Sequence, residues 1–199
     1  MSDTINIYMC GVGGQGIGLL SEVLTRACMS AGYTVHGCDT HGLAQRGGTV
    51  VSHLRLGDKI STPQVPPGKA DLVVALERLE AQRAAASMLS SGGTVVYYDT
   101  TYQPIHVRMG DAKYPSADQV IATIKKCGGK AMPVKLADLL DPRMQNVALI
   151  GQIAASGLLN GVDSAAFENA LKESLPAAAL DQNMKVFYGC IQRVGQSDC

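Results

Sequence analysis

The sequence predicts an α/β fold in which a mainly parallel sheet is flanked by helices in three layers. Three observations lead to this prediction. A glycine-rich turn joins a strand-like run to a helical pattern over Ile5–Leu20, INIYMCGVGGQGIGLL. Strand-like and helical segments then alternate along the chain, and two short runs, residues 70–76 and 94–98, are continuously apolar. Such runs are typical of strands buried on both faces of a parallel sheet, and the alternation implies crossover helices on those faces.

The glycine-rich turn comes first. Apolar and polar residues alternate over 5–10, and Gly11, Gly13 and Gly16 then fit the pattern G-x-G-x-x-G. The missing side chains allow a tight turn and let N–H groups at a helix N-terminus approach a phosphate or carboxylate. Close packing of the strand on its helix would need the same glycines without a ligand, so both interpretations stay open. Asp39 follows the second predicted strand, where a dinucleotide fold places an acid for the ribose. A Rossmann-like enzyme that binds a nicotinamide or flavin dinucleotide is therefore an alternative.

The next elements follow from periodicity and turn residues. Apolar residues at three- and four-residue spacing predict a helix from Ile17 to about Ala31, and Gly32 ends it. In order, we then expect strands over 34–38 and 49–56, the apolar strand 70–76, an Ala-rich helix over 77–89 and the apolar strand 94–98. Three prolines between 61 and 68 exclude regular structure there.

The second half is more helical. We expect an edge strand over 105–109, a helix over 118–127, a strand over 130–135, and helices from 142 to about 159, from 164 to about 175, and after Pro176. Pro133 confines its strand to a sheet edge. Asp141 and Pro142 form a good start for a helix, as N-cap and first helical residue. The last helix carries an apolar seam that needs a packing partner, more often its own domain than another chain.

Size and composition fit one domain over residues 1–199, with a C-terminal helical layer over about 142–195. Lys plus Arg equals Asp plus Glu at 17 each, so no global charge attracts nucleic acid or an acidic membrane. The six cysteines are scattered without a C-x-x-C pair, so we expect no iron–sulfur cluster or structural zinc site held by this chain. No secretory signal or membrane-spanning run is visible, which predicts a cytoplasmic protein with reduced thiols.

Several polar residues could carry chemistry. His36, Cys38 and His41, with His53, could form a metal site, but a buried thiol beside hydrogen-bonded imidazoles is the more common arrangement. Arg46 could present its guanidinium to a carboxylate or phosphate, or satisfy loop carbonyls instead. Cys10 lies beside the glycine-rich turn, and for it a packed thiol is favoured over one activated by a helix N-terminus.

Four stretches together resemble a known family. GVGGQGIGLLSEVL at 11–24, HGLAQRGGTVVSHLRLGD at 41–58, ADLVVALE at 70–77 and LDQNMKVFYGC at 180–190 look like the gamma subunit, or gamma domain, of 2-oxoacid:ferredoxin oxidoreductases. The HGLAQRGG form is most similar to the beta subunit of indolepyruvate ferredoxin oxidoreductase, more than to the pyruvate or 2-oxoglutarate branch. The resemblance implies a three-layer, Rossmann-like domain of the type called domain III in pyruvate-ferredoxin oxidoreductase.

The resemblance also implies a function. Such enzymes decarboxylate a 2-oxoacid on thiamine diphosphate with Mg, pass electrons through iron–sulfur clusters to ferredoxin, and release an acyl-CoA. Thiamine and clusters would belong to a partner subunit, so this chain would be auxiliary and inactive alone, with no catalytic or metal-binding residue of its own. The carried-over motif positions, facing the partner or the coenzyme A side, are Gly11, Gly13, Gly14, Gln15, Gly16, His41, Gln45, Arg46, Gly47 and Gly48. A scaffold subunit that binds no ligand, and a homodimer of the isolated chain, also remain open.

Overall fold

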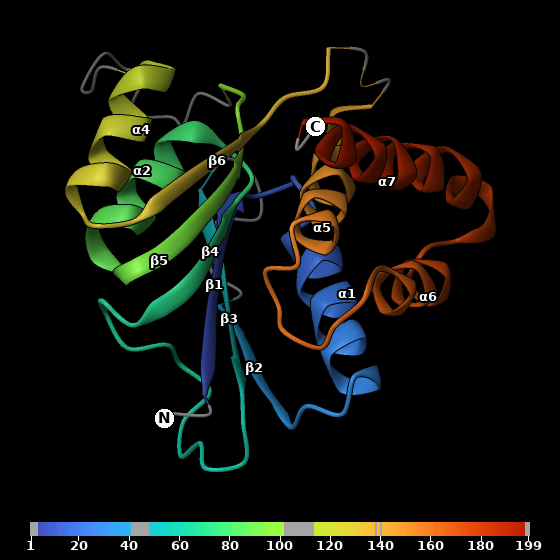
Figure 1. Cartoon of the computed structure of the whole chain (residues 1–199), viewed down its shortest axis with the longest axis horizontal. Coiled ribbons are helices and arrows are strands. Elements are labelled where there is room, and N and C mark those ends of the chain that lie inside the picture. The colour runs from blue at the N-terminus through green and yellow to red at the C-terminus, as the bar shows by residue number, and fades with distance from the viewer. Residues whose placement is uncertain (1–3, 41–47, 102–113, 138, 140, 198–199) are drawn as a thin grey trace.

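The structure is a computed structural model that describes residues 4–40, 48–101, 114–137, 139 and 141–197 (Figure 1). The edge strand expected over 105–109 lies outside the described residues. In the described part, six strands form one sheet in the order β2-β3-β1-β4-β5-β6. They are β1 Ile5–Val12, β2 Val35–Thr40, β3 Thr49–Leu56, β4 Ala70–Ala75, β5 Leu89–Tyr98 and β6 Lys130–Val134.

The sheet is mixed rather than uniformly parallel. The four strands β1, β4, β5 and β6 are all parallel to one another. β3 is antiparallel to both of its neighbours, β1 and β2. Ile7, for example, pairs with Leu54 of β3 on one side and Leu72 of β4 on the other. The predicted three-layer, mostly parallel architecture is confirmed, and among the described strands β6 lies at an edge of the sheet, as Pro133 indicated. The antiparallel β3 was not predicted.

Helices cover both faces of the sheet, as Figure 1 shows. α2 (Arg78–Ser87) and α4 (Ala117–Lys126) lie on one face. The other carries α1 (Ile17–Ser30), α5 (Gln145–Ala155), α6 (Ser164–Ser174) and α7 (Ala177–Ser197), and a short 3-10 turn, η1 (Pro142–Met144), precedes α5. Each face has its own apolar core. Within the described residues, no helix has the length and apolar character needed to cross a membrane.

The last helix packs on its own chain, as its apolar seam predicted. Phe187 of α7 is fully buried and Cys190 is nearly so. A Cβ added to Gly151 of α5 would lie 2.8 Å from the Cβ of Cys190 and 2.9 Å from the carbonyl oxygen of Phe187. The glycine therefore lets the backbones of α5 and α7 approach closely.

The clearest differences from the predicted boundaries lie in β5, β2 and α5, each for a local reason. β5 begins at Leu89, because the Ser-Ser-Gly-Gly run continues the strand past a register shift against β4. β2 continues to Thr40 because it pairs with β3 over its whole length. The helix after Asp141 starts as a 3-10 turn, with Asp141 accepting a hydrogen bond from the Arg143 N–H, and ends at Ala155 before Gly157, whose φ is 56°.

Candidate functional site at the carboxyl edge of the sheet

The predicted site lies where β1 and β4 end side by side. These two strands are parallel neighbours, and the helices that follow them cover opposite faces: α1 after β1, and α2 after β4. In open α/β sheets, ligands bind outside the carboxyl ends of the strands at such a switch point. The glycine-rich turn occupies this position.

Packing accounts for two of the glycines. Gly16 is the N-cap of α1 with φ 83°, a left-handed conformation that favours glycine. A Cβ there would lie 2.4 Å from Nδ2 of Asn146, which donates a hydrogen bond to the Gly16 carbonyl at 3.2 Å. A Cβ on Gly11 would meet Gln15 Oε1 and the Leu76 Cβ, each at 3.0 Å. The fold itself therefore requires glycine at these two motif positions.

The side chain of Gln15 fills the crevice between β1 and β4. Its Oε1 accepts a hydrogen bond from the Val12 N–H at 2.7 Å, and its Nε2 donates to the Leu76 carbonyl at 3.0 Å. Nε2 also lies 3.4 Å from Oε1 of Gln145 on α5, and Gln15 is only 5% exposed. One amide thus joins both strand ends and closes the space where a ligand of an α/β sheet usually enters.

Gly48 brings the two sequence motifs together. The Gly13 N–H donates a hydrogen bond to the Gly48 carbonyl at 2.9 Å. The segment that begins at His41 therefore ends directly against the glycine-rich turn. His41, Gln45, Arg46 and Gly47 lie outside the described residues, so their roles stay predictions.

A buried acid at the start of α2 was not predicted. Glu77 is completely buried, and its carboxylate caps α2 by accepting from the Leu79 N–H at 2.9 Å and the Glu80 N–H at 2.5 Å. It also accepts from the Tyr114 hydroxyl. Burial raises the pKa of Glu77, while these hydrogen bonds oppose the rise. Because the positive end of α2 already holds a carboxylate of its own chain, it does not suit an incoming anion.

An ion pair lies beside Glu77. Arg78 contacts Asp99 at the end of β5, with 2.6 Å between its Nη2 and the Asp99 Oδ1, and its backbone N–H donates to the Thr100 carbonyl at 3.3 Å. The sequence held a signal for both Glu77 and Asp99, because each directly follows a buried apolar strand. Their partners Tyr114 and Arg78 could not be paired with them without the fold.

The thiol beside the turn is packed, as favoured. Cys10 is 1% exposed and its Sγ donates to the Glu80 carbonyl, with 3.6 Å between sulfur and oxygen. Burial raises the pKa of Cys10, and the nearby carboxylates of Glu80 and Glu77 raise it further. The thiol therefore stays protonated and unreactive at neutral pH.

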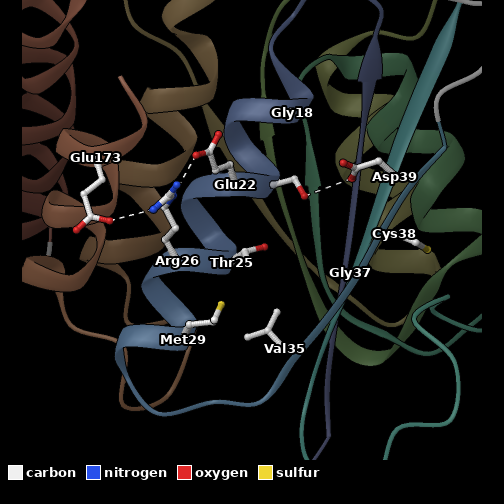
Figure 2. A pocket seen from close by; sticks show the side chains of 11 residues that line it. Gly18, Glu22, Thr25, Arg26, Met29, Val35, Gly37, Cys38, Asp39 and Glu173 are labelled. Carbon is white, nitrogen blue, oxygen red and sulfur yellow. Dashed lines mark hydrogen bonds and ion pairs between the residues drawn. The ribbon is translucent and has the colours of Figure 1, made fainter. Parts of the chain in front are cut away.

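Asp39 does not have the position that a dinucleotide-binding acid would need. That arrangement places the acid on the strand next to β1. Here β3 lies between β1 and β2, and Asp39 Oδ1 accepts hydrogen bonds from the hydroxyls of Ser21, at 3.3 Å, and Ser52. The carboxylate instead lines a groove between α1 and β2 (Figure 2).

The histidine and cysteine candidates do not assemble into a metal site within the described part of the chain. No group of three or more His, Cys, Asp or Glu side chains suited to a metal occurs among those residues. Cys38 and His53 are register partners on β2 and β3, but His53 Nδ1 accepts a hydrogen bond from the Val65 N–H at 3.1 Å. Burial lowers the pKa of His53, so it is a neutral, structural imidazole. His41 lies outside the described residues.

Curated relatives match about nine-tenths of the chain. It is 36% identical to indolepyruvate oxidoreductase subunit IorB of Archaeoglobus fulgidus over 186 residues, which cover 91% of this chain and 90% of the relative. The corresponding proteins of Methanothermobacter thermautotrophicus and Thermococcus kodakarensis are 31% and 33% identical, each over 92% of this chain and over 93% and 92% of their own length.

Solved structures share the fold. The pyruvate oxidoreductase subunit PORC of Thermotoga maritima has a TM-score of 0.68 at 19% identity, covering 95% of this chain and 96% of that one. The 2-oxoglutarate:ferredoxin oxidoreductase of Magnetococcus marinus, solved with 2-oxoglutarate, coenzyme A and succinyl-CoA bound, has a TM-score of 0.71 at 19% identity, covering 99% of this chain and 32% of that one. The model of the pyruvate ferredoxin/flavodoxin oxidoreductase family matches residues 6–191, and with relatives above 30% identity over nine-tenths of its length this chain belongs to that family.

Proposed function

We propose that the chain is a subunit of a 2-oxoacid:ferredoxin oxidoreductase of the indolepyruvate, or aryl-pyruvate, type. The complex would convert a 2-oxoacid and coenzyme A to an acyl-CoA and CO2, with the electrons passed to ferredoxin. The observation that carries this proposal is the match over 91% of this chain, at 36% identity, to a relative named for indolepyruvate. The whole chain, residues 1–199, is proposed to act as one gamma-type domain with α5 to α7 as its helical layer.

The chain's role in the complex is proposed to be auxiliary. We propose that a partner subunit holds the thiamine diphosphate with Mg²⁺ and the iron–sulfur clusters. These groups supply decarboxylation and electron transfer. At the carboxyl edge, Cys10 and Glu77 are buried and serve packing and capping. Arg78 is engaged by Asp99.

An anion such as the diphosphate of coenzyme A is compatible with the start of α1 rather than α2. No side chain caps α1, and its first turn contains no acidic residue. Because Gln15 closes the crevice between the strands, the anion would lie above the turn rather than between β1 and β4. Arg46 is the proposed cation for this anion, because it precedes Gly48, whose carbonyl is hydrogen-bonded to the turn.

The test is to co-express the full chain with its chromosomal neighbours, purify through a tag on this chain, and measure 2-oxoacid-dependent reduction of a viologen dye with and without coenzyme A. The proposal expects a brown, thiamine-containing partner and an aryl-pyruvate as the preferred oxoacid. A colourless lone chain that saturably binds NAD(H), NADP(H) or a flavin would overturn it.

Arg46→Ala separates a binding role from a scaffold role. Loss of a charge-assisted contact worth about 1.5–3 kcal/mol should raise the KM for coenzyme A by about tenfold or more, with the KM for the oxoacid unchanged. Arg46→Lys should recover part of the loss, because a bidentate contact becomes a single one. Lys59→Ala, in an exposed loop after β3, is the matched control. Unchanged kinetics for Arg46→Ala would favour the scaffold interpretation.

A further inference from the structure

The two edges of the sheet are protected differently. β6 forms one edge and carries Lys130 and Pro133, with Lys135 directly after it. Lys and Pro on an edge strand are the usual means of preventing another strand from pairing with it. β2, at the opposite edge, reads VHGCDT and contains neither residue type. The β2 edge is therefore the one that the sequence leaves able to accept a strand.

The register shows which backbone groups of β2 face outward. The Gly57 N–H donates to the Thr34 carbonyl at 2.9 Å, so this pair continues the β2–β3 ladder as a hydrogen-bonded pair. In an antiparallel ladder, alternate residues turn their N–H and C=O toward the same neighbour. Thr34 and every second residue after it thus face β3. Val35, Gly37 and Asp39 turn their backbone groups away from the sheet, beyond which the described residues place no further strand.

A groove runs along this edge on the α1 face. It has a volume of about 820 Å³, and β2 lines it with Val35, Gly37, Cys38 and Asp39, of which all but Cys38 turn their backbone groups outward. Its other wall is α1, where small residues leave space, and Met29 at the far end is 60% exposed. Figure 2 shows Thr25 and Met29 of α1 opposite Val35 and Asp39 of β2.

The charge of the groove indicates what fits it. Three carboxylates line it, from Glu22, Asp39 and Glu173, against the guanidinium of Arg26. That guanidinium is already paired with Glu22 at 3.0 Å and Glu173 at 3.1 Å. Asp39 is exposed and held by two hydroxyls, and within the described residues no cation pairs with it. A second copy that paired through this same edge would bring the same excess of carboxylates and be repelled, whereas a Lys or Arg on an incoming strand would be attracted.

We propose that the partner subunit adds an extended, basic segment to β2, with main-chain hydrogen bonds to Gly37 and its outward-facing neighbours and a Lys or Arg at Asp39. This inference rests on the proposed function, because that function supplies the partner subunit. Main-chain bonds would give affinity, and the groove between α1 and β2 would select the side chains, as in other cases of strand addition.

Gly37→Pro and Gly37→Ala test the backbone contact as a matched pair. Both add a Cβ, which would lie 3.3 Å from Leu54 Cδ1, but only proline removes the outward N–H. In the co-purified complex, Gly37→Pro should weaken subunit association by about tenfold and Gly37→Ala by about twofold at most. Equal affinity of the two variants, with equal urea midpoints, would overturn the inference.

A second pair of variants tests the charge contact at Asp39. Asp39→Asn should weaken association by about threefold and reduce its dependence on salt, while Asp181→Asn, on the exposed side of α7, should do neither. Amide hydrogen exchange of the unmodified complex keeps the inference testable if the proline variant does not fold. The amides of Gly37 and Asp39 should exchange rapidly in the lone chain and slowly in the complex, and no gain of protection would refute strand addition.

The outcomes separate this inference from the proposed function. An active complex in which β2 stays unprotected refutes strand addition alone. A lone chain that dimerises with rising concentration, and loses this ability in Gly37→Pro, would make a second copy the occupant and also refute it. If no partner subunit binds and no oxoacid activity is found, the proposed function fails and this inference fails with it.

Discussion

Replacing Gln15 tests whether its amide holds the two strand ends together. Gln15→Ala would leave the Val12 N–H and the Leu76 carbonyl without the partners that now lie 2.7 and 3.0 Å away. Val12 is 1% exposed and Leu76 is fully buried, so water cannot easily replace the lost contacts. Each unpaired buried group costs about 1–3 kcal/mol. For the two groups together, we therefore expect the free energy of unfolding to fall by about 2–6 kcal/mol, a large share of the roughly 5–15 kcal/mol of a typical domain.

Urea unfolding of the full chain measures this loss, and Gln152→Ala provides the control. Gln152 is half-buried on α5, where its Nε2 donates to Ser156 Oγ at 2.9 Å. Because water can replace that partner, losing the hydrogen bond should lower the free energy of unfolding by about 1 kcal/mol or less. If Gln15→Ala destabilises the chain no more than Gln152→Ala, the amide does not join the strands and the crevice is not closed by it.

Gln15→Glu gives the same shape with a pH-dependent result. The introduced carboxyl group can still accept from the Val12 N–H, but it can donate to the Leu76 carbonyl only when protonated. Its pKa in the folded state should therefore lie above the unfolded value of about 4.3. Stability from this group is then fully present below that pH and is lost as the pH rises through the folded-state pKa. A pH-independent stability difference from the parent chain would refute the hydrogen-bond assignment.

Three further predictions concern other buried groups. Because burial raises the pKa of Glu77, the stability of the parent chain relative to Glu77→Gln should be greatest below about pH 4.3 and decline as the pH rises through the folded-state pKa, as measured by urea unfolding at several pH values. Iodoacetamide should alkylate the half-buried Cys38 well before Cys10 in the folded chain, and peptide mass spectrometry giving the reverse order would contradict the packed-thiol assignment. Gly151→Ala should cost about 1–3 kcal/mol, because its Cβ would lie 2.8 Å from a side-chain carbon on α7. Gly189→Ala, with no neighbour within 4 Å, should stabilise the same pair of helices by about 0.5–1 kcal/mol.

Local patterns were sufficient to predict most of the fold. The apolar runs at 70–76 and 94–98 form central strands, and the apolar seam of α7 packs on its own chain, as predicted. The contacts of the candidate site were less predictable because they join distant residues. Gln15 and Leu76 are separated by 61 positions, and Glu77 and Tyr114 by 37. Nothing in the periodicity of either segment specifies such a pair, so the glycine-rich turn could be identified but not its closure by an amide.

The antiparallel β3 had a signal in the sequence, and it changes the interpretation of the site. β2 ends at Thr40 and β3 begins at Thr49, and a connection this short cannot return a strand in parallel, which takes about a dozen residues or more. β3 therefore folds back beside β2 and takes the place next to β1 that a dinucleotide fold gives to its second strand. Asp39 therefore lies one strand further from β1, in the groove at the sheet edge. Gln15 fills the crevice that Asp39 would have faced in a dinucleotide fold. The same chain reversal that disfavours dinucleotide binding thus leaves β2 at the edge of the described sheet, where the proposed partner subunit could add a strand.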